Sequence, residues 1–152
     1  MTRGRWLTSA NGHLTALPAA GSVDDMNVVA HGIDLIECER IDAVLRKHPD
    51  RFLARILTPD ERTYCERMKN PLPHIAGRFA AKEAVLKAIG TGWRGQIAWT
   101  DIEVLNDPAG QPHVSLSGQT EKVARGLGIT RILLSITHTK KNAAASAIGV
   151  SD

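Results

Sequence analysis

The hydrophobic positions of this chain alternate along some stretches and recur at helical spacing along others. From Asn27 the run NVVAHGIDLIEC is apolar and β-branched, which predicts a strand. A helix over about residues 37–47 is expected next, stopped by Pro49. The sequence TPDE at 58–61 predicts the start of another helix, because it places Thr at the N-cap, Pro at the first helical position and Glu in a capping box.

The second half of the chain predicts one long helix followed by two hairpins. Two prolines ahead of Arg78 are expected to break the chain before a helix begins there. Alternating apolar residues around the turn sequence DPAG predict a hairpin over 101–118, and a short helix is expected over about 120–127. In the final hairpin, RILLSITHT and AAASAIGV around a KKN turn, His138 ends an apolar strand face. The predicted fold class is α+β.

The helix RFAAKEAVLKAIGTG, residues 78–92, carries four charged side chains on an otherwise apolar surface. At about 100° per residue its apolar side chains form two arcs, which is typical of a mostly buried helix. Glu83 and Lys87 lie one turn apart in one gap between the arcs, and Arg78 and Lys82 lie in the other. An exposed Glu83–Lys87 pair would contribute only about 0.2–0.5 kcal/mol, whereas a buried carboxylate needs a cation or hydrogen-bond donors. The helix alone leaves both interpretations open.

The helix ends in two glycines. Gly90 suits the left-handed position after a helix, and Gly92 allows the close approach of a ligand or of backbone. Because these glycines follow a helix instead of preceding one, they do not form a Walker-type phosphate loop.

Composition indicates one globular domain without a membrane segment. The chain has 152 residues, 43% of them hydrophobic, and no apolar run approaches the roughly 18 residues of a membrane span. No secretory signal is recognisable, so a cytoplasmic location is the default. Cys38 and Cys65 lack metal-type spacing and are expected to be free thiols. Residues 1–25 are expected to be a disordered extension or the product of an upstream start codon, with 26–152 as the domain.

The formal net charge of +3 arises in one segment. Between residues 40 and 55 five basic residues stand against Asp42 and Asp50, and the rest of the chain balances. Aromatic residues make up only 4% and do not alternate with basic ones, which argues against a nucleic-acid surface. An acidic protein surface fits this segment better, with a solvated helix face as the alternative for each residue. The basic residues are Arg40, Arg46, Lys47, Arg51 and Arg55.

Asp34 is a second carboxylate in apolar surroundings, between Ile33 and Leu35 at the end of the first strand. Taken alone, it suits a helix cap as well as a functional site. Asp34 and Glu83 together offer two hard oxygen ligands from different elements, the usual protein contribution to a Mg²⁺ site that waters and phosphates complete.

Two ordered motifs closely resemble the holo-[acyl-carrier-protein] synthases of the 4'-phosphopantetheinyl transferase superfamily. The first is GIDLIECERI, residues 32–41, and the second is FAAKEAVLKAIGTG, residues 79–92. The resemblance extends over roughly residues 28–150 and includes the DIEV and SITHT segments. It implies a small antiparallel sheet packed with helices, and a homotrimer with active sites between subunits.

The resemblance implies transfer of the 4'-phosphopantetheine arm from coenzyme A to a serine of apo-acyl carrier protein, in fatty acid biosynthesis, with release of adenosine 3',5'-bisphosphate. Mg²⁺ would be held by Asp34 and Glu83, and Lys87 would act on the coenzyme A diphosphate. Glu83 or a metal-bound water would serve as general base. The other coenzyme A contacts expected by this resemblance are Arg78, Lys82, Gly90 and His138.

The resemblance also gives the basic segment a partner. Acyl carrier proteins are acidic and the family docks them on its first helix, where Arg40 and Arg51 match the basic contact positions. These residues would contribute steering and register. Two other functions stay open: a non-catalytic module that binds carrier protein or coenzyme A, and nucleic-acid binding through residues 40–55. The type of carrier, fatty-acid or polyketide, is also open.

Overall fold

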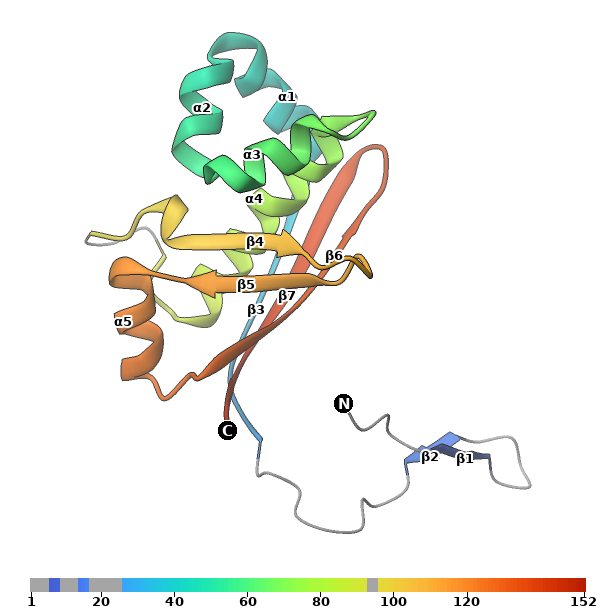
Figure 1. Ribbon diagram of the computed structural model, residues 1–152, viewed down its shortest axis with the longest axis vertical. Coiled ribbons are helices and arrows are strands. Elements are labelled where there is room, and N and C mark those ends of the chain that lie inside the picture. The colour runs from blue at the N-terminus through green and yellow to red at the C-terminus, as the bar shows by residue number, and fades with distance from the viewer. Residues whose placement is uncertain (1–5, 9–13, 17–25, 93–95) are drawn as a thin grey trace.

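The base of the fold is a three-stranded antiparallel sheet (Figure 1). The computed structural model describes residues 6–8, 14–16, 26–92 and 96–152. The strand order is β3-β7-β6, with β3 at Asn27–Glu37, β7 at Asn142–Ser151 and β6 at Arg131–His138. This sheet, together with the helices that pack on it, confirms the predicted α+β class.

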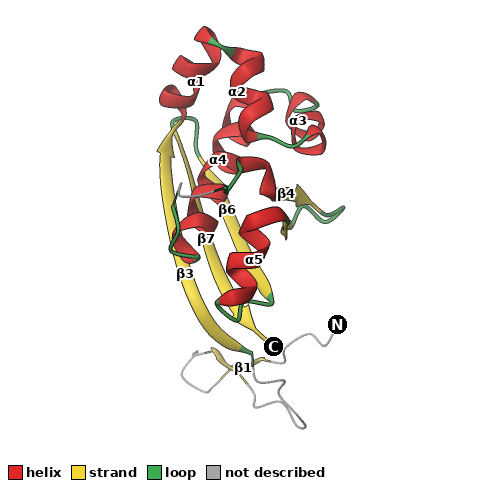
Figure 2. Ribbon diagram, turned by 90° about the vertical axis from the view of Figure 1, so that its left-hand side faces the viewer, coloured by secondary structure: helices red, strands yellow, loops and turns green. Residues whose placement is uncertain are grey.

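One long helix, α4 (Pro71–Ala88), lies against one face of the sheet (Figure 2). A Cβ at Gly32 of β3 would lie 2.0 Å from the Ala84 carbonyl oxygen and 2.6 Å from the Ala88 nitrogen, so only glycine allows this approach. Small side chains therefore bring the helix backbone down onto the strands. The buried alanines of this contact are Ala76, Ala80, Ala81, Ala84, Ala143, Ala145 and Ala147.

Three shorter helices cover the end of the sheet where β3 ends (Figure 1). They are α1 (Cys38–Lys47), α2 (Pro49–Ile56) and α3 (Pro59–Glu66). None of the helices in the described residues is long and apolar enough to span a membrane.

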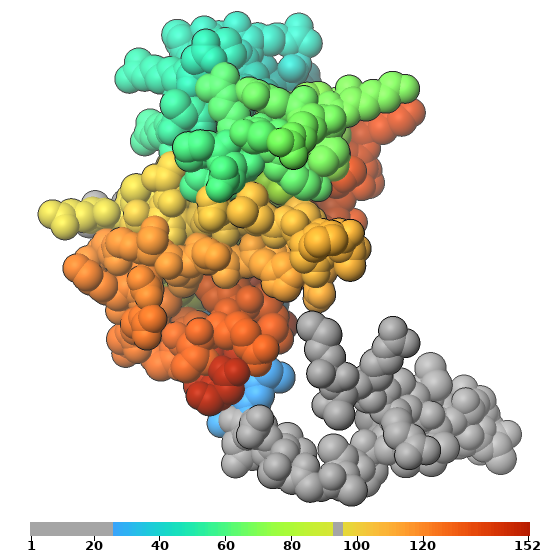
Figure 3. All heavy atoms as spheres, viewed as in Figure 1, coloured from blue at the N-terminus to red at the C-terminus, as the bar shows by residue number. Residues whose placement is uncertain are grey.

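A second hairpin lies beside α4. It follows the 3-10 turn η1 (Trp99–Asp101) and consists of β4 (Ile102–Asn106) and β5 (Pro112–Leu116). Helix α5 (Gly118–Gly126) then leads to β6. In Figure 3 the short helices, this hairpin and α5 follow one another along the long axis of the molecule.

Near the N-terminus, β1 (Trp6–Thr8) and β2 (Leu14–Ala16) form an antiparallel pair. The expectation that residues 1–25 precede the domain, which would begin at Met26, stays a prediction.

The structure confirms the predicted strands and differs from the predicted helices at three prolines. Pro49 ends α1 as expected, but it also occupies the first turn of α2, which the hydrophobic pattern does not predict. Pro71 and Pro73 lie in the first turn of α4, so they open this helix where a break was expected. The capping box at 58–61 is confirmed by bonds in both directions between the N-cap and the third helical residue.

The sheet face turned away from α4 exposes large apolar side chains. Ile33 and Leu35 of β3 are 62% and 68% exposed, and Leu133 of β6 is 39% exposed. Figure 2 shows the helices gathered on the other side of the sheet. His31 lies on the same open face, with its Nε2 3.0 Å from the Ser146 hydroxyl. Exposed apolar surface of this kind indicates a protein contact.

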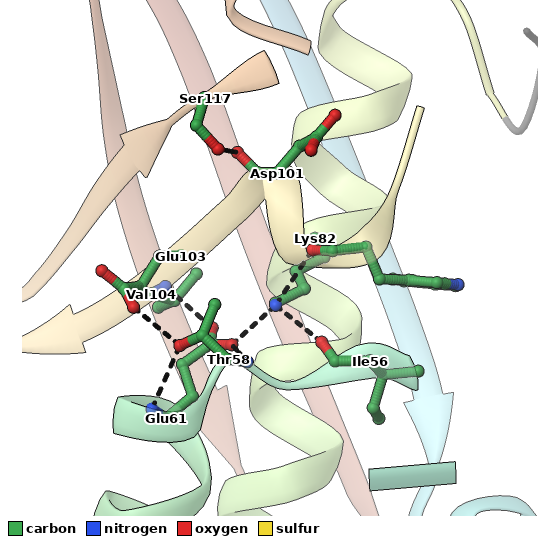
Figure 4. A network of polar contacts seen from close by, with 9 residues as sticks. Ile56, Thr58, Glu61, Lys82, Asp101, Glu103, Val104 and Ser117 are labelled. Carbon is green, nitrogen blue, oxygen red and sulfur yellow. Dashed lines mark hydrogen bonds and ion pairs between the residues drawn. The ribbon is translucent and has the colours of Figure 1, made fainter. Parts of the chain in front are cut away.

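A buried ion pair joins α4 to the short helices (Figure 4). Lys82 Nζ lies 2.7 Å from Glu61 Oε2, and both side chains are 0% exposed. The same ammonium donates to the carbonyl oxygens of Ile56 and Trp99, at 2.6 and 3.1 Å. All three donors of the lysine are therefore used.

The Glu61 carboxylate is satisfied in the same way. Besides Lys82 it accepts hydrogen bonds from the backbone nitrogens of Thr58 and Val104, each at 2.8 Å. Burial lowers the pKa of Lys82, and the charge and hydrogen bond of Glu61 act in the opposite direction. The pair thus fastens the end of α2, the start of α3, η1 and β4 to α4.

Replacing Lys82 with methionine removes the cation and leaves the Glu61 carboxylate buried. We expect Lys82→Met to lower the free energy of unfolding by about 3–5 kcal/mol, measured by urea denaturation followed by circular dichroism. Lys122→Met, on the exposed surface of α5, is the matched control and should unfold at the wild-type midpoint. Equal midpoints for the two variants would contradict this role of Lys82.

Candidate active site

The predicted metal ligand Asp34 and the predicted phosphate contact Lys87 lie together. Lys87 Nζ is 2.8 Å from Asp34 Oδ1 and donates to the Ile33 carbonyl oxygen at 3.1 Å. The Asp34 side chain is 14% exposed and the Lys87 side chain is 52% exposed. The carboxylate is therefore mostly enclosed, and the lysine reaches it from the solvent side.

Glu83 lies one turn before Lys87 on α4 and is half-buried. Strands β3 and β6 are parallel, since both pair antiparallel with β7. The first turn of α4 contacts His138 at the end of β6, and its last turns lie against Gly32, earlier along β3. The helix therefore runs antiparallel to β3. Asp34 follows Gly32 by two residues, so it lies beside the turn of α4 that contains Glu83. The structure brings these three predicted residues to one flank of α4.

Asp34 and Glu83 form a donor set that suits Mg²⁺, since this ion prefers carboxylate oxygens and retains several waters. Across the described parts of the chain there is no cluster of three or more His, Cys, Asp or Glu side chains that could hold a metal. An ion held by the two carboxylates would take its remaining ligands from water and from phosphate oxygens. The residues present therefore fit this ion.

Arg78 and His138, two predicted coenzyme A contacts, line one pocket on the opposite flank of α4, with a volume of about 210 Å³. Arg78 is 3% exposed, donates to Asn106 Oδ1 at 3.0 Å, and stacks 4.0 Å from the centroid of the Tyr64 ring. Its Nε is buried and has no hydrogen-bond partner among the described residues. A buried guanidinium with an unused donor is suited to an anionic ligand.

Lys82 belongs to neither group, and Gly90 follows Lys87 at the end of α4, where its backbone nitrogen donates to the Lys87 carbonyl oxygen at 3.2 Å. The three hydrogen bonds of Lys82 hold its ammonium inside the core, so it has no donor left for a phosphate (Figure 4). Its role is structural, in contrast to the expected contact with coenzyme A. Gly90 is exposed and has a φ of 72°, as predicted for a residue that ends a helix.

The predicted partner-binding residues Arg40 and Arg51 lie on exposed surfaces of α1 and α2. Within the described chain, no ion pair involves these two residues or Arg55, whereas Arg46 pairs with Asp42 at 2.7 Å. Positive charge next to an apolar hollow suits an acidic partner that also has apolar side chains. Such a hollow lies beside Arg55 and is lined by Phe52, Ile56, Phe79 and Trp99.

Sequence reasoning missed three residues of the Arg78 pocket: Tyr64, His74 and Asn106. They come from α3, α4 and β4, and none belongs to a recognisable motif. The available signal was the i,i+4 spacing of His74 and Arg78, which places both on one side of a helix. The break expected at the prolines concealed it, because it placed His74 outside the helix.

Comparisons with known proteins identify the family of this chain. Residues 30–137 match the family model described as 4'-phosphopantetheinyl transferase superfamily. The holo-[acyl-carrier-protein] synthase of Koribacter versatilis is 46% identical over 121 residues, which cover 80% of this chain and 97% of that protein.

Solved structures give the same result. The Plasmodium yoelii acyl carrier protein synthase with ADP bound has a TM-score of 0.76 and 35% identity, covering 84% of this chain and 98% of that chain. The Bacillus anthracis holo-(acyl-carrier-protein) synthase in complex with CoA (3',5'-ADP) has a TM-score of 0.68 and 38% identity, covering 82% and 98%. The chain therefore belongs to the 4'-phosphopantetheinyl transferase superfamily and, within it, to the holo-[acyl-carrier-protein] synthase family.

Proposed function

We propose that this chain transfers 4'-phosphopantetheine from coenzyme A to a serine of apo-acyl carrier protein, with Mg²⁺ as cofactor. The serine oxygen forms a bond to the phosphorus that carries the pantetheine arm, the pyrophosphate P–O bond breaks, and adenosine 3',5'-bisphosphate leaves. The observation that carries the proposal is the contact of Asp34 with Lys87, one turn from Glu83, on one flank of α4.

The residues on this flank match the needs of the reaction. Negative charge develops on the phosphate oxygens and on the leaving group, so fixed cations supply much of the stabilisation. Lys87, which is half-exposed beside Asp34, would donate to the diphosphate from the solvent side of the site. Asp34 and Glu83 would hold Mg²⁺, which supplies neutralisation of phosphate charge. Glu83 would also accept the serine proton, directly or through a water molecule.

The pocket on the opposite flank would bind the nucleotide end of coenzyme A. Arg78 contributes the charge of its guanidinium there, and His138 lines the same pocket. The Plasmodium yoelii relative has ADP bound and the Bacillus anthracis relative is in complex with CoA, which supports a nucleotide ligand.

The second substrate would dock on α1 and α2 through Arg40 and Arg51. Their exposure, and the apolar hollow next to Arg55, support an acidic protein as the partner. We assign the reaction to fatty acid biosynthesis in the cytoplasm. The free thiols Cys38 and Cys65, confirmed in the structure, are in keeping with a reducing compartment.

We further propose a homotrimer with active sites between subunits. Asp34, Glu83 and Lys87 lie on the β3 flank of α4, and the Arg78 pocket lies on the other flank, so a neighbouring subunit would unite the two groups. The exposed apolar face of the sheet, which includes Leu35, supplies surface for such an assembly.

The transfer is tested by mass spectrometry of apo-acyl carrier protein incubated with coenzyme A, Mg²⁺ and this chain. The carrier should gain the mass of phosphopantetheine, and EDTA should prevent the gain until excess Mg²⁺ is added. Glu83→Gln keeps the shape but removes the charge, so kcat should fall by about 100-fold or more. Glu121→Gln, on the surface of α5, should keep the wild-type rate. A folded wild-type chain that binds coenzyme A but modifies no carrier would instead be a non-catalytic module.

Carrier docking is tested by charge reversal on α2. Arg51→Glu should lower kcat/KM for the carrier by about tenfold at low salt and by less at high salt, because ions screen exposed charges. Lys122→Glu makes the same change in net charge on α5 and should have little effect. Equal losses in the two variants would show that net charge, and not this surface, attracts the carrier.

The shared site is tested by mixing two inactive variants with different tags, co-expressed and purified as mixed assemblies. Arg78→Met removes the cation on one flank of α4, and Glu83→Gln removes the carboxylate on the other. If neighbouring subunits form each site, random mixing leaves about a quarter of the sites with both residues, and activity should return accordingly. No recovery, in assemblies shown to contain both chains, would mean that each site lies within one chain.

A further inference from the structure

The Arg78 pocket carries basic side chains and no acidic one. Arg78, His74 and His138 line it, and its other lining residues include neither Asp nor Glu. Two histidines beside a buried guanidinium form a concentration of potential positive charge that suits a phosphate group. The remaining lining residues are Tyr64, Pro73, Gly77, Asn106, Gly110, Pro112 and Ile136.

His74 lies in the middle of a row of rings. Its centroid is 5.2 Å from that of His138 and 6.1 Å from that of Tyr64, with interplanar angles of 65° and 70°. Arg78 lies one turn further along α4 and stacks on the same Tyr64 ring. His74 thus contacts His138 directly and shares the Tyr64 ring with Arg78.

The surroundings of His74 disfavour its protonated form. Burial lowers the pKa of His74, and the nearby His138 and Arg78 lower it further. The groups that face it are Tyr64 from α3, Arg78 from α4, His138 from β6 and the neutral Asn106 from β4. Because no carboxylate lines the pocket, the lowered pKa favours the neutral ring at pH 7, and an anion in the pocket would favour its protonation.

We propose that His74 is a further ligand-binding residue of this site, which takes up a proton from solvent when a phosphate group of the nucleotide occupies the pocket. The identity of the ligand as coenzyme A rests on the proposed function. The negative charge of the anion stabilises the protonated His74 ring and raises its pKa, because no neighbouring carboxylate in the pocket does so. Binding and proton uptake are therefore linked, and the affinity for the nucleotide rises as the pH falls from 8 to 6.

The size of the effect follows from linkage. A ligand that raises the pKa of one group by one unit binds up to about tenfold more tightly at low pH. The phosphate itself has a second pKa of about 6 and loses charge at low pH. This second effect is the same for every variant of the protein, so it cancels when the wild type is compared with variants at His74.

The test is calorimetric titration of the full chain with coenzyme A and with inorganic phosphate, in buffers of different ionisation enthalpy. The number of protons taken up per ligand should fall in His74→Phe, which keeps the ring contacts, and in His74→Asn. Between pH 8 and pH 6 the wild type should gain about three- to tenfold in affinity over both variants. At pH 8, where His74 is neutral, His74→Phe should bind within about twofold of the wild type. His48→Asn, on the exposed end of α1, should behave as the wild type.

Two results would overturn the proposal. One is equal proton uptake by the wild type and both His74 variants. The other is a loss of affinity in His74→Phe that is the same at pH 6 and pH 8, since packing alone would produce it. If the wild type takes up protons with inorganic phosphate but does not bind coenzyme A, the result supports a role of His74 in anion binding and contradicts the proposed function. If it binds neither ligand, both fail.

Discussion

The arrangement of this molecule depends on the buried ammonium of Lys82. Its bonds to Ile56, Glu61 and Trp99 fasten the short helices and η1 to α4. Successive residues of a helix point about 100° apart, so fixing Lys82 on one flank also fixes the direction of Glu83 on the other. A contact that is remote from any ligand thereby orients the carboxylate of the proposed metal site.

Much of the site was predictable because it depends on spacing within short segments. Helical periodicity alone separates Glu83 and Lys87 from Arg78 and Lys82, and the structure keeps this division. Periodicity does not reveal which gap between the apolar arcs faces the core, so nothing in the pattern opposed the expectation, drawn from the resemblance, that Lys82 contacts coenzyme A. That distinction comes from Glu61, which approaches only in the folded chain.

The errors at prolines and in the pocket have a related cause. A proline that interrupts one helix also suits the first turn of the next, so the helix starts at Pro49 and Pro71 were predicted only as stops. The Arg78 pocket unites α3, α4, β4 and β6, and its ring contacts exist only once these elements pack. Hairpins and caps were easier to predict, because adjacent residues form them.

The contact at Gly32 has a consequence for metal selectivity. Backbone meets backbone there, with the strand held against Ala84 and Ala88. Asp34 follows Gly32 by two residues and Glu83 precedes Ala84 by one, so this main-chain contact limits how far apart the backbones that carry the two carboxylates can lie. Mg²⁺ demands a compact and regular coordination shell, whereas Ca²⁺ accepts longer and less regular ones. In the proposed metal site, the glycine would therefore help to determine which size of ion fits between the two carboxylates.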